Sequence, residues 1–405
     1  MKKIILALLV FIYADVKGDY WTQRANFTST GASGSFSFVI GSKGYVCCGV
    51  DVSYNFINDF WEYNPQSNIW TQKANFPGVP RTYSSGFSIG NKGYAGLGND
   101  PFAFSAFQDF YEYDPITNVW TQKLNFGGLG RSAAVSFSIG NMGYFATGRS
   151  NQNILFNDLW QYDPLLNIWT QKANLPSIYL SRFSANSFVI GNNAYLVAGI
   201  TSNFGSYTYL SDLWQYNSIT NSWIQKANFP GVARFGGAAF TILNKGYFGS
   251  GSDTIYNYLN DFWQYDPLTN VWIQKANVPG IGRDLSAYFS IGNKGYFGIG
   301  GEIPIYTYTD WWEYTPDTTT SITNLPSSTV NLQLTPNPAK EFVTIGFQSK
   351  QKTKLTITDI AGKTVYANDV YKSNNKISIS KLAAGVYTVK ISDGKQSGVK
   401  KFVKE

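Results

Sequence analysis

The chain of 405 residues contains no histidine, only two cysteines and only two methionines. The absence of histidine excludes catalytic sites in which a serine or cysteine nucleophile is activated by an imidazole. Zinc and copper sites usually use histidine, or cysteines at ligand spacing, and this sequence offers neither. We therefore expect no metal site and no cofactor.

The two cysteines, Cys47 and Cys48, are neighbours in a segment with the pattern of a β-strand. Successive side chains of a strand point to opposite faces, and neighbouring cysteines therefore rarely form a disulfide. We interpret both as small buried apolar residues.

An excess of charge is also missing from most of the chain. The formal net charge is +7, but residues 340–405 alone hold 13 lysines and 5 acidic residues. The remainder carries 19 basic and 20 acidic residues. Because this larger part is not basic, the composition gives little support to nucleic-acid binding.

Long apolar runs are absent apart from residues 4–12, which are too few to span a membrane. This run follows Lys2 and Lys3, and the pattern is typical of a secretory signal peptide over residues 1–18. Cleavage is expected after Ala14 or Gly18. The mature chain is then expected to lie outside the cytoplasm and to contain no transmembrane segment.

Aromatic residues, in contrast, are abundant at 17%, and they recur with a period close to 50. Three markers each occur six times. A tryptophan opens a W-x-Q segment at Trp21, Trp70, Trp120, Trp169, Trp223 and Trp272. A small residue precedes tyrosine at Tyr45, Tyr94, Tyr144, Tyr195, Tyr247 and Tyr296. An aspartate opens a third segment at Asp59, Asp109, Asp158, Asp212, Asp261 and Asp310.

Each repeat unit predicts four short strands. In the fifth unit they are expected at residues 238–242, 247–251, 261–265 and 271–276. A tight turn is expected between the first two, with Asn244 and Gly246 supplying its positive φ angles. The third segment is apolar on both faces, which one isolated sheet cannot cover. Stacking against neighbouring copies would bury both faces.

The ends of the repeat region predict how the array closes. The first W-x-Q segment, at Trp21, has no strands before it, and the last unit ends near Pro316 without such a segment. We expect the N-terminal strand to complete the last unit, which removes the open sheet edges. The prediction is an all-β fold, a six-bladed β-propeller over residues 19–316.

The repeat resembles the kelch family. The resemblance rests on the period, on glycines that close the second strand, and on the pattern D-[FL]-W-x-Y-[DN]-P-x-x-N-x-W. It implies a kelch-type propeller. The sequence departs from the family pattern in one respect, because only the sixth unit has adjacent glycines, Gly300 and Gly301.

After residue 316 the composition changes. Residues 317–330 are rich in Thr and Ser and have the character of a linker, and residues 331–405 are expected to form a small β domain. The motifs L-x-P-N-P-A at 334–339, D-I-A-G-K at 359–363, L-x-x-G-V-Y at 382–387 and K-x-V-K at 401–404 resemble the type A sorting domain of type IX secretion. The resemblance implies an Ig-like β-sandwich that engages the secretion machinery, and a cargo that is released or attached to the cell surface.

An arginine recurs in the connection between successive units. These residues are Arg81, Arg131, Arg182, Arg234 and Arg283, and the first unit has Ala32 instead. One interpretation is an anion-binding funnel at one mouth of the central channel, since arginine presents a fork suited to carboxylates. The other, which we favour, is that each arginine binds carbonyls of neighbouring loops.

The loop between the second and third strands varies most between units. It carries the further candidate ligand-binding residues Tyr54, Phe104, Tyr207, Tyr209, Tyr256, Tyr258 and Tyr306. Aromatic rings beside amides and hydroxyls suit a sugar or a peptide. Alternatively, these rings cover the rims of neighbouring blades.

Three functions are compatible with these features. The first is a secreted or surface-attached, non-catalytic protein that binds a glycan or another protein. The second is a sugar-modifying enzyme that resembles kelch-type sialic-acid epimerases, which requires arginine and an acid at the channel mouth. Candidate acids are Asp51, Asp100, Asp253 and Glu302. The third is a structural scaffold of the surface or matrix.

Overall fold

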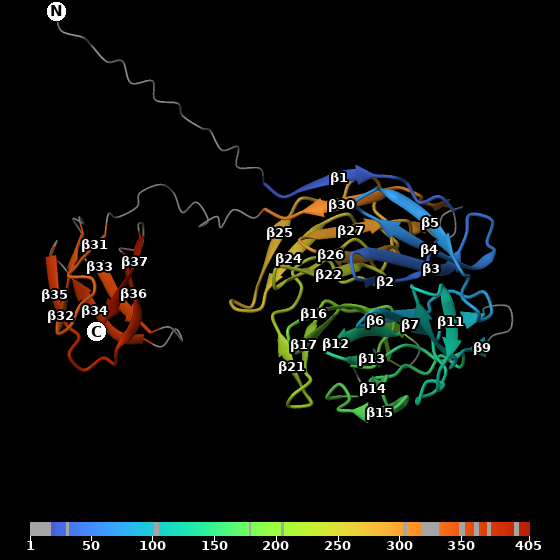
Figure 1. Cartoon of the computed structure of the whole chain (residues 1–405), viewed down its shortest axis with the longest axis horizontal. Coiled ribbons are helices and arrows are strands. Elements are labelled where there is room, and N and C mark those ends of the chain that lie inside the picture. Colours follow the sequence, from blue (N-terminus) through green and yellow to red (C-terminus); the bar gives the residue numbers. More distant parts are fainter. Residues whose placement is uncertain are drawn as a thin grey trace, which may run out of the picture. The chain divides into compact units, whose positions relative to one another are not determined.

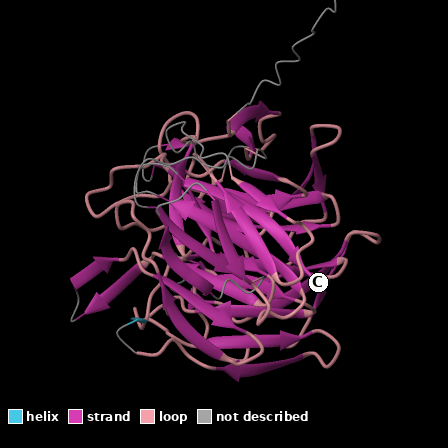
Figure 2. Cartoon of the chain, turned by 90° about the vertical axis from the view of Figure 1, so that its left-hand side faces the viewer, coloured by secondary structure: helices cyan, strands magenta, loops and turns pink. Residues whose placement is uncertain are grey.

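The computed structural model describes residues 18–29, 32–100, 105–177, 180–203, 206–302, 306–317, 332–347, 353–359, 364–370, 374–392 and 397–405. The expected signal peptide and nearly all of the expected linker lie outside these ranges. The described residues form strands, turns and loops, with no α-helix and one short 3-10 helical position at Leu180 (Figure 2). The chain divides between residues 318 and 319 into two units, which are considered separately.

Six antiparallel four-stranded sheets make up the first unit. Blade 1 contains β2 (Phe36–Ile40), β3 (Lys43–Val50), β4 (Phe56–Asn64) and β5 (Ile69–Lys73). Blade 2 contains β6 (Ser85–Ile89), β7 (Lys92–Gly96), β10 (Phe110–Asp114) and β11 (Val119–Gln122). Blade 3 contains β12 (Val135–Ile139), β13 (Met142–Ala146), β14 (Leu159–Asp163) and β15 (Ile168–Lys172).

The remaining blades repeat this order. Blade 4 contains β16 (Asn186–Ile190), β17 (Asn193–Val197), β20 (Leu213–Asn217) and β21 (Ser222–Lys226). Blade 5 contains β22 (Ala238–Ile242), β23 (Lys245–Gly249), β24 (Phe262–Asp266) and β25 (Val271–Lys275). Blade 6 contains β26 (Ala287–Ile291), β27 (Lys294–Gly298), β30 (Trp311–Thr315) and β1 (Tyr20–Arg24).

The N-terminal strand closes the ring, as the order of repeats predicts. β1 pairs antiparallel with β30, with Trp21 opposite Tyr314, and Figure 1 shows the two strands side by side. The innermost strand β2 contacts both β6 and β26, so the first blade touches the second and the sixth. The six-bladed propeller is thereby confirmed.

Neighbouring blades lock together at the small residue that precedes each repeat tyrosine. Phe38 of blade 1 packs on Gly93 of blade 2, where an added Cβ would lie 2.4 Å from the ring. The same contact joins Phe87 to Gly143, Phe188 to Gly246, Phe240 to Gly295 and Phe289 to Gly44, with Cβ distances of 2.0–2.3 Å. At these five interfaces glycine leaves the space that a phenylalanine ring of the preceding blade occupies, whereas blade 4 has Ala194 at the same position.

Aromatic rings fill the interface between the blades. The tyrosine of each third strand is fully buried, at Tyr63, Tyr113, Tyr162, Tyr216, Tyr265 and Tyr314. Tyr45 stacks on Phe60 of its own blade and also contacts Tyr113 of the next. The high aromatic content thus serves mainly to build the core.

Within blade 5 the predicted strands agree with the observed ones to within two residues. The tight turn differs in detail. Its two left-handed residues are Leu243 and Asn244, whereas the sequence suggested Asn244 and Gly246. In the other units a glycine occupies the position of Leu243, as at Gly90 with a φ of 56°.

The second unit consists of two sheets that share one apolar core. The first has the order β31 (Gln333–Thr335), β32 (Phe342–Gly346) and β35 (Asn374–Ser378). The second has the order β34 (Thr364–Val370), β33 (Thr353–Thr358), β36 (Gly385–Ser392) and β37 (Ser397–Lys404). Val343 and Ile345 of one sheet belong to the same core as Leu355 and Val389 of the other. The unit is therefore a small β-sandwich.

The glycine contact between blades predicts the effect of a single methyl group. Gly93→Ala places a Cβ against the ring of Phe38, and overpacking of this kind should lower the free energy of unfolding by about 1–3 kcal/mol. Urea denaturation of the full chain measures it. The control is Ala194→Gly, the same position in blade 4, which should cost no more than about 1 kcal/mol. Unchanged stability of Gly93→Ala would contradict close packing here.

Candidate functional site

The five repeated arginines lie inside the blades, not at the channel mouth. In blade 5, Nη1 and Nη2 of Arg234 donate to the two carboxylate oxygens of Asp261, at 2.5 and 2.9 Å. Nε donates to the carbonyl of Val232 and Nη1 also donates to the carbonyl of Ser250. The same four bonds recur for Arg81 with Asp109, Arg131 with Asp158, Arg182 with Asp212 and Arg283 with Asp310.

This arrangement disagrees with the first interpretation of these arginines, an anion-binding funnel. The side chains of these arginines are no more than 2% exposed, and most of their donors are used within the blade. Loop carbonyls take part, as the interpretation that we favoured expects, but the main partner is the aspartate that opens the third strand. The apolar residue two positions before that aspartate packs on the guanidinium, as Phe156 does on Arg131 at 3.8 Å.

A closed ring of backbone hydrogen bonds surrounds the channel next to these arginines; we call it the neck. It joins Gly34, Tyr83, Ala133, Ser184, Gly236 and Leu285, one residue from each blade. Each N–H donates to the carbonyl of its counterpart in the preceding blade at 2.8–3.2 Å, and Gly34 donates to Leu285. All six residues have positive φ. The neck thus links all the blades in one cycle.

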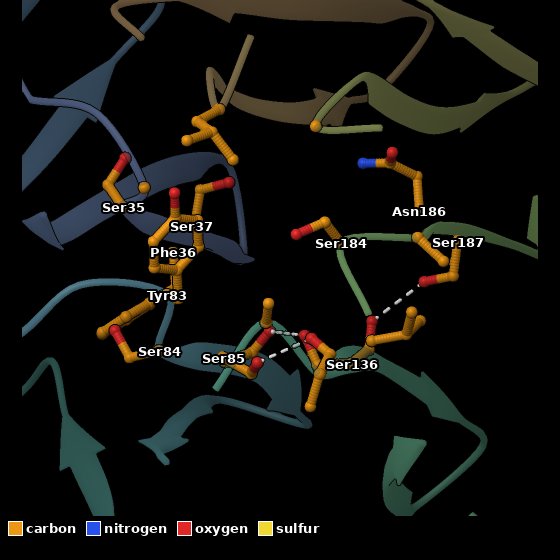
Figure 3. Close-up of a pocket in the computed structure, with 18 of the residues that line it drawn as sticks. Ser35, Phe36, Ser37, Tyr83, Ser84, Ser85, Ser136, Ser184, Asn186 and Ser187 are labelled. Carbon is orange, nitrogen blue, oxygen red and sulfur yellow. Dashed lines mark hydrogen bonds between the residues drawn. The ribbon is translucent and has the colours of Figure 1, made fainter. Parts of the chain in front are cut away.

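Hydroxyl groups line the channel beside the neck. Its cavity has a volume of about 150 Å³, which is large enough to hold several water molecules. Figure 3 shows Ser35 and Ser37 on one side of the cavity and Ser184 and Asn186 on the other. Among the described residues, the Oγ atoms of Ser35 and Ser84 have no hydrogen-bond partner, and neither does Oδ1 of Asn186. Such groups are suited to bind water or a small polar ligand.

Isolated β-bridges form the mouth above the neck. In each blade, the residue before the neck residue pairs with a residue just after the second strand. The pairs are Ser33–Val50, Thr82–Asn99, Ser132–Arg149, Phe183–Ile200, Phe235–Ser252 and Asp284–Gly301. The repeated connection and the variable loop therefore lie at the same end of the propeller. Of these twelve positions only two carry charge, Arg149 and Asp284.

Asp284 is buried, and this raises the pKa of its carboxyl from 3.8 to about 7. Ser252 donates a hydrogen bond to Oδ2 at 2.9 Å, and Oδ1 has no partner among the described residues. Burial raises the pKa of the Tyr83 hydroxyl in the neck. The nearby carboxyl of Asp284 raises this pKa further, and the charge of Arg149 lowers it. Arg149 itself stacks on Phe183 at 4.5 Å. These groups make the mouth electrically asymmetric.

The sequence reasoning missed this asymmetry. Aligning the residue after each repeated arginine would have revealed it, because Asp284 stands where the other units have Thr82, Ser132, Phe183 and Phe235.

The loops around the mouth alternate between two types. In blades 1, 3 and 5 a short loop is closed by the side chain of its first residue, Asp51, Ser150 or Asp253. In blades 2, 4 and 6 two strands pair instead: β8 (Asn99–Asp100) with β9 (Ser105–Ala106), β18 (Ile200–Asn203) with β19 (Ser206–Tyr209), and β28 (Gly301–Glu302) with β29 (Tyr306–Thr307). The face thus has an approximate threefold pattern.

The short loops present their fourth residue in a left-handed conformation. In blade 5, Asp253 accepts hydrogen bonds from the backbone N–H groups of Ile255 and Asn257, and Tyr256 has a φ of 60°. Burial would raise the pKa of Asp253, but these bonds outweigh it and lower the pKa. Tyr54 in blade 1 and Asn153 in blade 3 occupy the same position, with φ values of 61° and 60°.

The predicted aromatic residues divide into three groups. Tyr54, Tyr207, Tyr256 and Tyr306 are 51–65% exposed. Tyr209 and Tyr258 are half-buried, and Tyr209 packs against Phe235, as the rim-covering alternative expects. Phe104 lies outside the described residues.

The candidate acids are mostly engaged in local structure. Asp51 and Asp253 close the short loops, and Glu302 accepts a hydrogen bond from the hydroxyl of Tyr308 at 2.8 Å. Asp100 lies on β8 at the mouth. The described part of the chain contains no cluster of acidic or cysteine side chains able to hold a metal ion. It also contains no helix long and apolar enough to cross a membrane.

Residues 333–405 match the family model of the secretion system C-terminal sorting domain. These residues are a type IX sorting domain. The domain indicates that the chain is secreted or attached to the outer surface of the cell, and that it interacts with the type IX secretion machinery.

The propeller is similar to the solved structure of YjhT, a kelch-repeat propeller, with a TM-score of 0.61 and 17% identity. The match covers 72% of this chain and 97% of YjhT. In all, 530 solved chains match, so the fold alone does not specify a function. No curated protein sequence matches the chain.

The buried ion pairs predict a large loss of stability when the arginine is removed. Arg234→Ala leaves Asp261 without its partner and should lower the free energy of unfolding by about 3–5 kcal/mol. The matched control is Lys245→Ala, which breaks the more exposed pair with Asp266 and should cost less than about 1 kcal/mol. Urea denaturation compares the two. Equal effects would show that burial of the arginine contributes little.

The raised pKa of Asp284 predicts a dependence of stability on pH. Its pKa is higher in the folded than in the unfolded chain, so folding is favoured while the carboxyl is protonated and this advantage is lost as pH rises. Between pH 4 and 7, stability should fall by up to about 4 kcal/mol from this group. Asp284→Asn should remove that part of the slope. A variant with the slope of the unmodified chain would show that the carboxyl is not buried as described.

Proposed function

We propose that the exported propeller is a binding protein whose ligand is a glycan, held on the face that carries the mouth. The observation that carries the proposal is the exposure of Tyr54, Tyr207, Tyr256 and Tyr306, whereas the tyrosines of the repeat core are buried. They belong to blades 1, 4, 5 and 6. An exposed aromatic ring on a rigid support offers an apolar face for the C–H groups of a sugar.

The hydrogen-bonded loops that carry two of these tyrosines should hold the rings in place before a ligand binds. Tyr54 and Tyr256 stand on loops with the same hydrogen bonds, each closed by the carboxylate of the first residue and by an asparagine that follows the tyrosine. Preorganised rings lose little conformational freedom on binding. The hydroxyl-lined cavity inside the neck adds polar groups that match those of a carbohydrate.

The variant that tests this proposal keeps the loop and removes the ring. Tyr256→Asn recreates the residue of blade 3, where Asn153 has the same φ, so the loop should be preserved. The full chain is screened on an array of neutral and acidic glycans, and the affinity of a positive glycan is measured by calorimetry. Tyr256→Asn should weaken binding at least about tenfold, which is 1.4 kcal/mol.

The control is Ile255→Ala on the same loop, because Ile255 is 73% exposed but not aromatic. Its affinity should stay within about twofold of the unmodified chain. Absence of any glycan binding, or an equal loss in the control, would contradict the proposal and favour a protein ligand or a scaffold role.

A sugar-modifying enzyme is the second candidate, for one reason. Asp284 has a pKa of about 7 and lies at the mouth, and a carboxyl in this range can act as a general acid or base near neutral pH. The test is the exchange rate of sugar anomers, measured by NMR with and without the full chain. An exchange rate that the unmodified chain increases, and that Asp284→Asn does not increase, would favour the enzyme. If the chain does not increase the rate, non-catalytic binding remains the proposed function.

A further inference from the structure

Cys47 and Cys48 do not point to opposite faces of the blade, which corrects the sequence-based expectation. Their Sγ atoms lie 3.1 Å apart, and both side chains are 1% exposed. The reason is a β-bulge in the pairing of β3 with β4, between Cys47 and Gly49. At the bulge Cys48 lies opposite two residues of β4, Asn58 and Asp59, and its φ is 66°. Because a left-handed residue interrupts the extended backbone, the regular alternation of strand side chains stops at this point.

The bulge belongs to the repeat and is not caused by the cysteines. The residue that follows the same point of the second strand is left-handed in every blade. These residues are Cys48, Leu97, Thr147, Ala198, Ser250 and Ile299, with φ values from 49° to 66°. Only blade 1 has cysteine at this position and at the one before it. The propeller backbone therefore brings the two sulfur atoms together.

Blade 1 also differs from the others in lacking the arginine that holds this bulge. In blades 2 to 6, Nη1 of the repeated arginine donates to the carbonyl of the left-handed residue, as Arg131 does to Thr147 at 2.9 Å. Ala32 occupies the arginine position in blade 1. Asp59 is the counterpart of the aspartates that bind these arginines, and it accepts a hydrogen bond from the hydroxyl of Ser29 instead. It also accepts one from Trp61, as the aspartates of blades 3 to 6 do from their tryptophans.

We propose that Cys47 and Cys48 form a disulfide in the exported protein, and that this bond holds the bulge of blade 1 where the other blades use the arginine. The sorting domain places the chain outside the cytoplasm, where disulfides form and persist. The bond forms by exchange with a small or protein disulfide. The two cysteines lose two protons and two electrons, and the S–S bond of the oxidant breaks to give two thiols.

The bond forms while the chain folds. In the folded blade the thiols are buried among Phe36, Phe60 and Phe76, and burial raises the pKa of Cys47, so that little thiolate is available for exchange. Adjacent Cα atoms are about 3.8 Å apart, which is shorter than the usual separation in disulfides. The bond should therefore be reduced more easily than an ordinary structural disulfide.

The test refolds the full chain with a mixture of reduced and oxidised glutathione. The product is then unfolded with N-ethylmaleimide, without reductant, and its intact mass is measured. The expected chain takes up no N-ethylmaleimide and is lighter by about 2 Da than the reduced chain. After treatment with a phosphine reductant it takes up two equivalents. Two equivalents without reductant, or a glutathione adduct, would overturn the proposal.

A matched control moves the pair by one residue. The double variant Val46→Cys and Cys48→Ser keeps two adjacent cysteines but places both in the regular part of β3, where side chains alternate. It should remain reduced and take up two equivalents. Formation of the bond in this variant would show that the bulge is not the cause.

The reverse experiment transplants the pair. Ala146 and Thr147 hold the equivalent positions in blade 3, where Thr147 has a φ of 60°. With Cys47→Ala and Cys48→Thr in the background, Ala146→Cys and Thr147→Cys should again give a chain that takes up no N-ethylmaleimide. A transplanted pair that stays reduced would overturn the role assigned to the repeat backbone. Thermal unfolding of every variant checks that it folds.

Discussion

Every blade of this propeller depends on its neighbours because a single four-stranded sheet cannot bury its own aromatic faces. The contact that meets this need is the phenylalanine ring of one blade seated on the glycine backbone of the next, as with Phe38 and Gly93. It leaves little room for a side chain, which explains why the residue before the repeat tyrosine is glycine in five blades and alanine in blade 4. The ion pairs between arginine and aspartate stabilise the blades, and the hydrogen-bonded neck links them. Both depend on the ring of blades that this packing holds together.

The use of arginine inside the blades determines where recognition can occur. A residue that appears once per blade serves the architecture, as Arg234 does with Asp261. Positions that break the repeat are free for other roles, and the mouth gathers several of them. Arg149 and Asp284 give it a positive and a titratable group, and Tyr54 and Tyr256 project from rigid loops. The repeated residues therefore stabilise the propeller, and the residues that differ between blades provide the groups that can bind a ligand.

The sequence was sufficient to predict the number of blades, the closing strand and the sorting domain, because each leaves a repeated or family-specific pattern. It could not place the arginines, since their partners lie 27–30 positions away and only the tertiary fold brings Arg131 to Asp158. It could not foresee the contact between Cys47 and Cys48 either, because a left-handed residue inside a strand leaves no sign in the side chains. The strand β34 of the second unit is also hard to recognise in the sequence, because it alternates poorly and has exposed residues at Ala367–Asp369.

The pairing of β1 with β30 also determines when, during synthesis of the chain, the propeller can close. Arg24 of β1 and Glu313 of β30 are bound to each other across 289 positions of the chain. Contacts between such distant segments form slowly, and until they form, β1 and β30 present unpaired edges to other chains. The N-terminal strand must wait until almost the whole propeller has been made. The sorting domain follows β30 in the chain, so the segment that directs export is completed only after the ring has all the strands that it needs to close.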